Sequence, residues 1–399
     1  MPGSRKPIHT TVIYFAVMAV LVAITGCGGA ALRNSDPPEL SAKVEIPGIP
    51  RARFWGDEWP EALRTASESN LSQASSLYNT RHHYLAISRG GANGAFGAGL
   101  LCGWSAAGTR PEFTMVTGIS TGALTAPFAF LGSKYDDTLK TIYTTISTKD
   151  IVKKKSAFAI LFSDSMVDTT PLKAMIARYI NAYIVDAIAG EYKKGRRLFI
   201  GTFNLDADRS VIWDIGAIAV SNYSGKLELI HEILRASAAI PVAFPPVMIQ
   251  VEANGKKFDE LHVDGGTSSQ VFVYPATVDW KSIMERSKVQ GTPEVYVIRN
   301  SFLESDVNGV KPQLIPIATR SVDSLIRTQG IGDFYQIYAL CQRDGTNFNL
   351  AWIPSDFTEK PAESFDPVYM EKLFDRGFQM AREGYPWEKA PPGFIVNPE

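Results

Sequence analysis

The chain alternates between short apolar runs and longer stretches in which apolar residues recur at helical spacing. The clearest alternation begins at Tyr84, where an apolar run leads into a small-residue helix that extends to about Ala107. A second apolar run, residues 113–117, is followed at once by a helix-forming stretch from Ala123 to Leu131. Strands that alternate with helices predict a mainly parallel sheet covered on both faces. The expected fold class is therefore α/β, as a three-layer α/β/α sandwich.

Apolar periodicity extends this pattern along the chain. Further strands are expected at residues 197–204, 210–214, 295–299 and 347–353. Further helices are expected at residues 136–147, 171–184, 227–239, 322–340 and 367–383, with a short one around 61–69. We divide the chain into a signal peptide, a tether with an N-terminal extension, the α/β domain, and a helical extension packed on the core, at residues 1–26, 27–80, 81–300 and 301–399.

The N-terminus has the features of a targeting signal. Arg5 and Lys6 precede an apolar run over residues 11–24, which is shorter than the roughly 20 residues of a membrane-spanning helix. The run stops at Ile-Thr-Gly-Cys, which resembles a bacterial lipobox, so we expect cleavage before Cys27 and lipidation of its thiol. The alternative is an ordinary secretory signal with an incidental cysteine. The residue after Cys27 is Gly28. An aspartate at this position would resemble an inner-membrane retention signal, so glycine favours the outer membrane of a bacterial envelope, facing the periplasm.

Charge and composition exclude several classes of protein. Residues 1–26 carry two basic and no acidic side chains, so 38 basic and 41 acidic residues remain, and nothing favours nucleic-acid binding. Five histidines and the lack of a Cys-x-x-Cys or His-Glu-x-x-His spacing predict no metal and no other cofactor. Besides Cys27 there are Cys102 and Cys341; Cys102 falls on the small-residue helix, where a buried thiol is expected. The sequence indicates no particular protein partner.

The most informative chemical motif is Gly118-Ile119-Ser120-Thr121-Gly122, between the second apolar run and its helix. Strand, Gly-x-Ser-x-Gly and helix together predict a nucleophile elbow. Gly118 and Gly122 are expected where the backbone passes so close to neighbouring elements that a Cβ would clash. The helix N-terminus behind the serine favours the negative charge that develops during acyl transfer. Ser120 is therefore the candidate nucleophile; the alternative is a chance pattern in a chain with 32 glycines.

A glycine-rich loop follows the first apolar run and reads Ser88-Arg89-Gly90-Gly91-Ala92-Asn93-Gly94. No Lys-Ser or Lys-Thr follows, so the loop is not a Walker A motif, and the glycine spacing does not fit the dinucleotide pattern Gly-x-Gly-x-x-Gly. The bare amides of Gly90 and Gly91 at the mouth of a helix suit an oxyanion hole, to which the amide of Thr121 would add a third donor.

An acidic motif, Asp264-Gly265-Gly266, ends another strand-like run. A carboxylate at a strand end, released into a glycine turn, can reach the end of a neighbouring strand. Taken alone, such a sequence is more often only a turn.

These three motifs, with the segment Arg235–Pro246 and its Ala-Ser-Ala-Ala-Ile-Pro sequence, resemble the patatin-like phospholipase family. The resemblance covers roughly residues 84–275. It implies a patatin-like fold, a Ser120–Asp264 dyad that works without histidine, and an oxyanion hole in the glycine loop. It also implies acyl esters of membrane lipids as substrates and residues 81–300 as the catalytic domain. The motif glycines that it matches are Gly90, Gly91, Gly94, Gly118, Gly122, Gly265 and Gly266.

Two positions of the glycine loop depart from the family pattern. Arg89 stands where a first glycine is expected, and Asn93 stands where a basic residue is expected. If the first position requires a positive φ, Arg89 is strained. Otherwise, its guanidinium group can lie at the mouth of the site.

Several alternatives remain open at this point. A Ser–Asp–His triad would need His231 or His262, the histidines that follow Ser120 in the chain. A non-catalytic lipid-binding or scaffold lipoprotein could keep the same fold, and the acyl group could pass to an alcohol instead of water. The basic triplet at residues 153–155, beside the apolar residues 158–162, is either a membrane-facing loop or, as isolated basic runs usually are, a solvated one.

Overall fold

The structure is a computed structural model that describes residues 33–60, 64–65, 71–156, 159, 163–304 and 309–394. The expected signal peptide and Cys27 lie outside the described residues. So do most of the short helix expected around residues 61–69 and four of the apolar residues that follow the basic triplet, which are 158 and 160–162.

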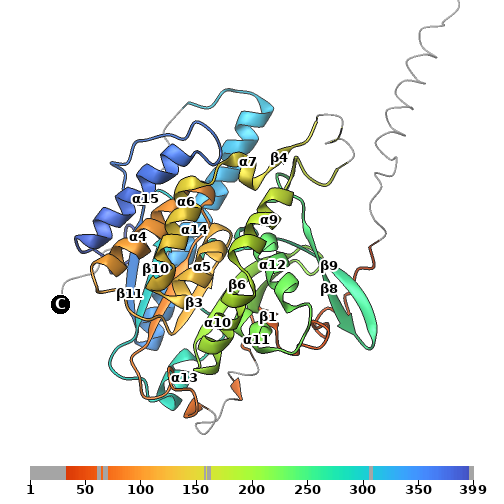
Figure 1. Ribbon diagram of the computed structural model, residues 1–399, viewed down its shortest axis with the longest axis vertical. Coiled ribbons are helices and arrows are strands. Elements are labelled where there is room, and N and C mark those ends of the chain that lie inside the picture. The colour runs from red at the N-terminus through yellow and green to blue at the C-terminus, as the bar shows by residue number, and fades with distance from the viewer. Residues whose placement is uncertain are drawn as a thin grey trace, which may run out of the picture.

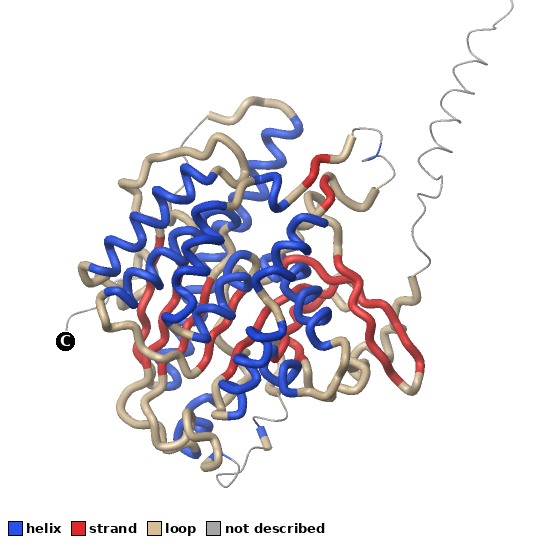
Figure 2. The backbone as a smooth tube through the Cα atoms, viewed as in Figure 1, coloured by secondary structure: helices blue, strands red, loops and turns tan. Residues whose placement is uncertain are grey.

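A mixed sheet forms the centre of the molecule (Figures 1 and 2). Within the described residues it has nine strands, with the order β1-β7-β6-β3-β2-β10-β11 and with β9 and β8 joined to β6. The neighbours that pair in parallel are β6 (Arg197–Asn204), β3 (Met115–Gly118), β2 (His83–Ile87), β10 (Glu294–Arg299) and β11 (Asn347–Trp352). The strands that join antiparallel are β1 (Arg53–Trp55), β7 (Arg209–Asp214), β8 (Val247–Ala253) and β9 (Lys256–Asp264). A separate hairpin pairs β4 (Lys153–Lys154) with β5 (Val167–Asp168).

Strand β6 aligns the two segments that carry the chemical motifs. Its first half pairs with β3, so that Gly118 lies opposite Ile200. Its last residues pair with β9, so that Asp264 lies opposite Thr202. Strand β7 occupies the other edge of β6, so β3 and β9 share a single edge, one after the other. The ends of β3 and β9 therefore meet beside the middle of β6.

The sheet separates two apolar layers, and β2 shows how. Leu85 and Ile87 belong to a core cluster on one face, whereas Tyr84 and Ala86 belong to a cluster on the other face, because successive side chains of a strand point in opposite directions. The first face is covered by α4 (Gly94–Ala106), α5 (Thr121–Leu131), α12 (Lys226–Ser237) and α15 (Pro367–Arg382). The second is covered by α13 (Trp280–Arg286) and α14 (Leu314–Asp344). The α/β sandwich with a mainly parallel sheet is confirmed.

Two of the expected helices end earlier than expected. The helix expected at residues 136–147 ends at Thr145 as α6 (Asp136–Thr145), and Ser147 and Asp150 form a capping box that begins the separate helix α7 (Thr148–Ile151). Residues 171–184 form α9 (Thr170–Tyr179) and the start of α10 (Ala182–Lys193). There the Asn181 side chain accepts a hydrogen bond from the Ile184 amide and caps α10. Helix α11 (Ile215–Val220) follows β7.

The C-terminal part of the chain contains a longer helix than expected, and it is more closely joined to the sheet. Helix α14 begins at Leu314, eight residues before the expected start, and ends at Asp344. The next residue, Gly345, caps it in the left-handed conformation with a φ of 69°. Pro316 lies in the first turn, where its missing amide hydrogen costs nothing. Beyond α14, β11 pairs with β10, so the segment after residue 300 contributes to the central sheet as well as packing on it.

Helices α4 and α15 touch through glycines. A Cβ at Gly99 would collide with the Phe374 carbonyl, and one at Gly377 would collide with the Phe96 carbonyl. The two backbones are therefore in direct contact, and α15 holds in place the helix that follows the glycine-rich loop (Figure 1).

Candidate active site

Ser120 lies in the tight turn between β3 and α5. Its backbone has φ 57° and ψ −123°, a conformation that a non-glycine residue rarely adopts. A Cβ at Gly118 would collide with the Gly122 carbonyl, and a Cβ at Gly122 would collide with the Ile87 carbonyl. Both glycines thus stand at points of close approach, as the sequence predicts, and the turn places Ser120 at the N-cap of α5.

A serine that the sequence did not single out holds this turn in place. Ser237, the last residue of α12, accepts a hydrogen bond from the Ser120 amide at 3.0 Å and donates one to the Gly201 carbonyl at 2.7 Å. Two residues further on, the Ala239 carbonyl accepts a hydrogen bond from the Asp264 amide at 2.9 Å. The Ala-Ser-Ala-Ala-Ile-Pro segment therefore fixes the backbones of both Ser120 and Asp264.

Asp264 ends β9 and is only 1% exposed. Its Oδ1 accepts a hydrogen bond from the Gly266 amide at 2.7 Å. Burial raises the pKa of the carboxyl group, while the Arg89 charge, the Ser120 side chain and the Gly266 amide act in the opposite direction. Ser120 is thus close enough to influence Asp264, although Oδ2 accepts no hydrogen bond of normal geometry from the described residues. The structure brings together the serine and the carboxylate that the sequence predicts as partners.

Arg89 is not strained. Its φ is not among the positive values found for non-glycine residues, so the first of the two interpretations of this position is wrong. Its side chain lies against Gly266, where a Cβ would approach the Arg89 Cδ to 2.6 Å. The guanidinium charge lowers the pKa of Asp264, which shows that Arg89 contributes positive charge beside the carboxylate.

Three backbone amides of the glycine loop and the serine turn are free. Within the described residues, the amides of Gly90, Gly91 and Thr121 donate no hydrogen bond. Gly91 has a φ of 56°, which glycine adopts without cost. A Cβ at Gly90 would collide with the Asn300 carbonyl, and a Cβ at Gly94 would collide with the Thr121 side chain. The loop and the serine turn are therefore in close contact.

Asn300 fixes the glycine loop from the end of β10. It is fully buried, and its side-chain amide donates to the Ser88 carbonyl at 2.9 Å while its Oδ1 accepts from the Gly97 amide at 3.1 Å. The sequence feature that indicates Asn300 is its position, because its polar side chain comes directly after a strand that is mostly apolar. Asn93, the second departure from the family pattern, accepts a hydrogen bond from the Tyr369 hydroxyl at 2.7 Å and so connects the loop to α15.

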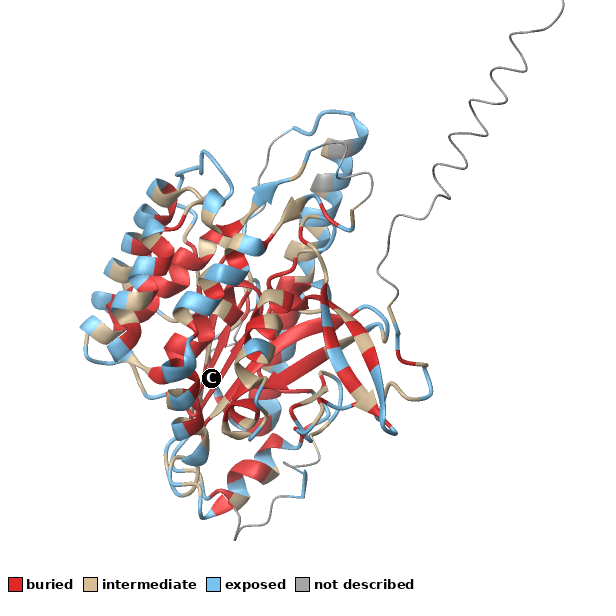
Figure 3. Ribbon diagram, turned by 45° about the vertical axis from the view of Figure 1, so that its right-hand side comes forward, coloured by how far each residue is buried: buried red, intermediate tan, exposed pale blue. Residues whose placement is uncertain are grey.

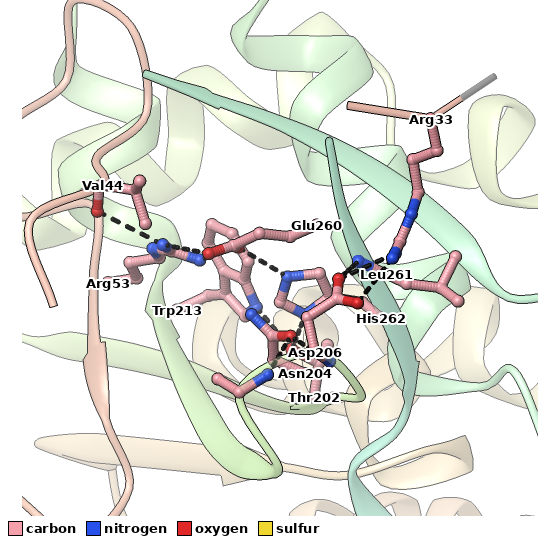
Figure 4. Close-up of polar contacts among 11 residues, drawn as sticks. Arg33, Val44, Arg53, Thr202, Asn204, Asp206, Trp213, Glu260, Leu261 and His262 are labelled. Carbon is pink, nitrogen blue, oxygen red and sulfur yellow. Dashed lines mark hydrogen bonds and ion pairs between the residues drawn. The ribbon is translucent and has the colours of Figure 1, made fainter. Parts of the chain in front are cut away.

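His262 belongs to a separate buried network (Figure 4). Trp213 Nε1 donates to Thr202 Oγ1 at 2.8 Å, Thr202 contacts His262 Nδ1 at 3.0 Å, and His262 Nε2 contacts Glu260 at 3.0 Å. Because the ionised Glu260 carboxylate can only accept, the imidazole donates from Nε2, and Nδ1 of the neutral ring accepts the Thr202 hydroxyl hydrogen. Both ring nitrogens are therefore engaged away from Ser120. Burial lowers the pKa of His262, which keeps the ring neutral.

Glu260 is the charged member of this network. Burial opposes its ionisation, but the His262 hydrogen bond and the Arg53 charge outweigh burial and lower the pKa of Glu260 to about 2. Arg53 comes from β1 and contacts both carboxylate oxygens, one of them at 2.8 Å. The network thus connects the first strand to β9, four residues before Asp264. The second histidine of the triad alternative, His231, is bonded to the Ile180 carbonyl at 2.6 Å.

The site is closed. Ser120 is 5% exposed. A cavity of about 60 Å³, lined by Ile119, Gly265 and residues of α14, adjoins the serine turn but does not include Ser120. That volume is room for about two water molecules, which is too little for a long acyl chain. A larger cavity of about 840 Å³ lies at the other end of the strands, around His82, and does not include Ser120.

Other site types receive no support from the described residues. They contain no cluster of histidine, cysteine, aspartate and glutamate side chains that could bind a metal ion. Cys102 and Cys341 are both buried as free thiols, and burial raises the pKa of each to about 12. Among the described helices, none combines the length and the apolar character needed to cross a membrane.

Comparison with known proteins agrees with this geometry. Residues 85–277 match the family described as patatin-like phospholipase. These residues form a patatin-like phospholipase domain. The match begins in β2 and ends after the Asp-Gly-Gly motif, so it includes the glycine loop, Ser120 and Asp264, whereas Asn300 and Tyr369 lie beyond it. The resemblance predicted from the sequence is confirmed.

Two further comparisons add little to this assignment. VipD from Legionella pneumophila is similar in structure with a TM-score of 0.33 and 12% identity, over 76% of this chain and 67% of that chain. No curated protein sequence matches the chain.

Proposed function

We propose that this protein hydrolyses carboxylic esters of membrane lipids, with Ser120 as nucleophile and Asp264 as proton acceptor. The observation that carries the proposal is the meeting of Ser120, in its strained turn, with a buried carboxylate and three free amides. Strain of this kind is found at functional sites, where the surrounding structure maintains it. Here the surrounding structure is Ser237 and the two elbow glycines.

The proposed reaction follows from these positions. Ser120 Oγ attacks the ester carbonyl as its proton passes to Asp264, and the amides of Gly90, Gly91 and Thr121 stabilise the oxyanion. The proton then moves to the leaving alcohol, and water releases the acyl group by the reverse sequence. A free aspartate titrates near pH 4 (about 3.9), so it is a weak base. Burial raises the pKa of Asp264 and makes it a stronger one.

Labelling with a fluorophosphonate probe tests the proposal. The folded protein should form a covalent adduct that mass spectrometry locates on Ser120, and the Ser120→Ala variant should not. If the folded protein stays unlabelled and cleaves no ester presented in vesicles, micelles or solution, the non-catalytic scaffold alternative replaces the proposal.

We also propose that the chain is attached to the bacterial envelope through a lipid on Cys27, on the outer membrane and facing the periplasm. The support is the apolar run that stops at Gly-Cys. Metabolic labelling with a fatty acid analogue should mark the wild type and not the Cys27→Ala variant. An unmodified Cys27 in the processed wild-type protein would contradict the attachment.

A further inference from the structure

The first half of α14 presents an apolar surface to solvent. Leu314 is 84% exposed and Leu325 is 71% exposed, and Ile317, Ala318 and Val322 are exposed as well. At 100° per residue these five positions fall on one side of the helix. The charged residues of this half, Arg320, Asp323 and Arg327, fall on the other side. Usually it is the buried face of a helix that is apolar, so this half of α14 reverses the normal pattern.

The second half of the same helix follows the normal pattern. Phe334, Ile337 and Leu340 are buried against the sheet, while Gln336 and Tyr335 face solvent. The reversal is therefore confined to the part of α14 that extends beyond the sheet. Figure 3 shows this part and the loop before it as an exposed projection at the top of the molecule.

Two more exposed apolar side chains lie near the hairpin β4–β5. Val242 is 75% exposed and has a φ of 69°, which is unfavourable for a β-branched residue. Its carbonyl accepts a hydrogen bond from the amide of Met166, which is also exposed. The exposed lysines Lys153 and Lys154 form the other strand of this hairpin. Figures 1 and 3, which differ by 45°, both place the hairpin and the first half of α14 at the same end of the molecule.

Both apolar groups lie on segments that contact the closed site. Val242 lies three residues after Ala239, whose carbonyl accepts a hydrogen bond from the Asp264 amide. On the other side, Gln329 of α14 contacts the Ser268 carbonyl and accepts a hydrogen bond from Gln270 at 2.6 Å. An exposed hydrophobic surface is costly unless something covers it, and here its two parts lie on segments that contact the loops around Ser120, which is only 5% exposed.

We propose that this end of the molecule docks on an anionic lipid bilayer, with Leu314, Ile317, Val322 and Leu325 of α14 on one side and Met166 and Val242 on the other entering the headgroup region. The inference rests on the proposed lipid esterase for its purpose, since docking would present the bilayer to the closed site. A bilayer is favoured over a protein partner because the apolar side chains come from separate projecting segments and have exposed lysines beside them. Lysine side chains next to an apolar surface are attracted to anionic headgroups.

Fluorescence quenching tests the contact without any turnover. A bimane probe is attached at Leu325→Cys in full-length protein that also carries Cys27→Ser and Ser120→Ala; the two remaining cysteines are buried. The matched control carries the probe at Tyr183→Cys, an exposed position on α10. Vesicles of phosphatidylcholine and phosphatidylglycerol with nitroxide-labelled acyl chains should quench the Leu325 probe at least threefold more than the Tyr183 probe. Equal quenching at both positions, or none at either, overturns the proposal.

The lysines are tested by charge reversal. Lys153→Glu with Lys154→Glu should weaken binding to the anionic vesicles by more than about fivefold, and added salt should reduce this difference. The control is Lys256→Glu with Lys257→Glu, an equally exposed pair on the β8–β9 hairpin, which should bind like the wild type. Equal losses in both pairs would overturn the assignment of this end of the molecule.

Activity measurements separate this inference from the proposed function. Val322→Asp with Leu325→Asp should reduce hydrolysis of vesicle lipid at least tenfold while changing hydrolysis of a dissolved p-nitrophenyl ester less than twofold. If the wild type cleaves neither substrate, the esterase is wrong and the quenching result still decides the docking. The fluorescence of the Leu325 probe could instead change with protein concentration in the absence of lipid and stay unchanged with vesicles. In that case the surface contacts a second copy of the chain, and the docking proposal fails.

Discussion

The Ser237 hydroxyl accepts a hydrogen bond from the Ser120 amide, across 117 residues of sequence. Ser237→Ala should leave this buried amide unsatisfied and cost about 1–3 kcal/mol of unfolding free energy. Because the bond holds the strained turn, kcat should fall by more than KM changes. Ser224→Ala, at an exposed serine, is the control and should change neither. A Ser237→Ala enzyme with wild-type kcat and lower stability would reduce Ser237 to a purely structural residue.

The dyad predicts strong non-additivity. Ser120→Ala and Asp264→Asn should each lower kcat by about a thousandfold or more, and the double variant should lose little beyond either single one, because the two groups act as a unit. Steady-state kinetics on a dissolved ester measures all three. Circular dichroism and the thermal midpoint verify that each variant is folded. Activity retained in folded Asp264→Asn would rule Asp264 out as the proton acceptor.

Arg89 predicts a shift in the pH dependence of the reaction. Asp264 must be ionised to accept the serine proton, so activity should fall as the pH drops through the pKa of Asp264. The Arg89 charge lowers that pKa. Arg89→Gln should therefore move the acidic limb of the kcat/KM profile to higher pH. Arg178→Gln, an exposed arginine on α9, should leave the limb where it is. A limb that stays in place or moves to lower pH in Arg89→Gln would contradict the assignment.

Glu260 predicts an acid-sensitive part of the stability. Its pKa is about 2 in the folded protein against 4.5 when unperturbed. A lowered folded pKa gives stability that is fully present above pH 4.5 and is lost as the pH falls towards 2, on the order of 3 kcal/mol in all. Urea unfolding at pH 6 and pH 3 measures it. In Glu260→Gln this component should be missing, so the variant should lose less stability between the two pH values than the wild type.

The glycine contact between α4 and α15 predicts opposite effects of the same substitution at two sites. Gly99→Ala should destabilise the protein by about 1–3 kcal/mol, because the new methyl group has no room beside the Phe374 carbonyl. Gly190→Ala, on α10 with open space around it, should stabilise by about 0.5–1 kcal/mol, because alanine favours the helix. Chemical unfolding of the two variants compares them directly. Equal effects would mean that the helices can move apart freely.

Short-range pattern was enough to predict the elbow, the glycine loop and the aspartate. Gly118 and Gly122 stand beside Ser120 in the sequence, and the steric need for them arises within the same turn. The alternation of strand and helix likewise depends on neighbouring residues, so the α/β sandwich could be predicted. Helix α14 was predicted too short because its solvent-facing half lacks the usual buried apolar stripe.

Contacts between distant segments could not be predicted in the same way. Ser237 and Asn300 act on Ser120 and Ser88 through hydrogen bonds that only the folded chain creates. The conformation of Arg89 was left open because sequence does not fix φ, and its answer depends on how the loop meets Gln270, whose carbonyl accepts the Arg89 amide hydrogen. The role of His262 was decided by two neighbours: Thr202, which lies on the adjacent strand β6, and Glu260, which lies on the same strand β9.

The shared edge of β6 has a consequence for how the site is assembled. Ser120 lies two residues after Gly118, which lies opposite Ile200, and Asp264 lies opposite Thr202, so a single strand sets the offset between the proposed nucleophile and its proposed base. The carbonyl of Gly201, which lies between those two positions, also accepts a hydrogen bond from the Ser237 hydroxyl. A slip of one residue in either pairing would turn its side chains to the opposite face of the sheet. The proposed reactive pair therefore forms only when three distant stretches of the chain have docked on β6, and under the proposed mechanism a newly made molecule is inactive until that moment.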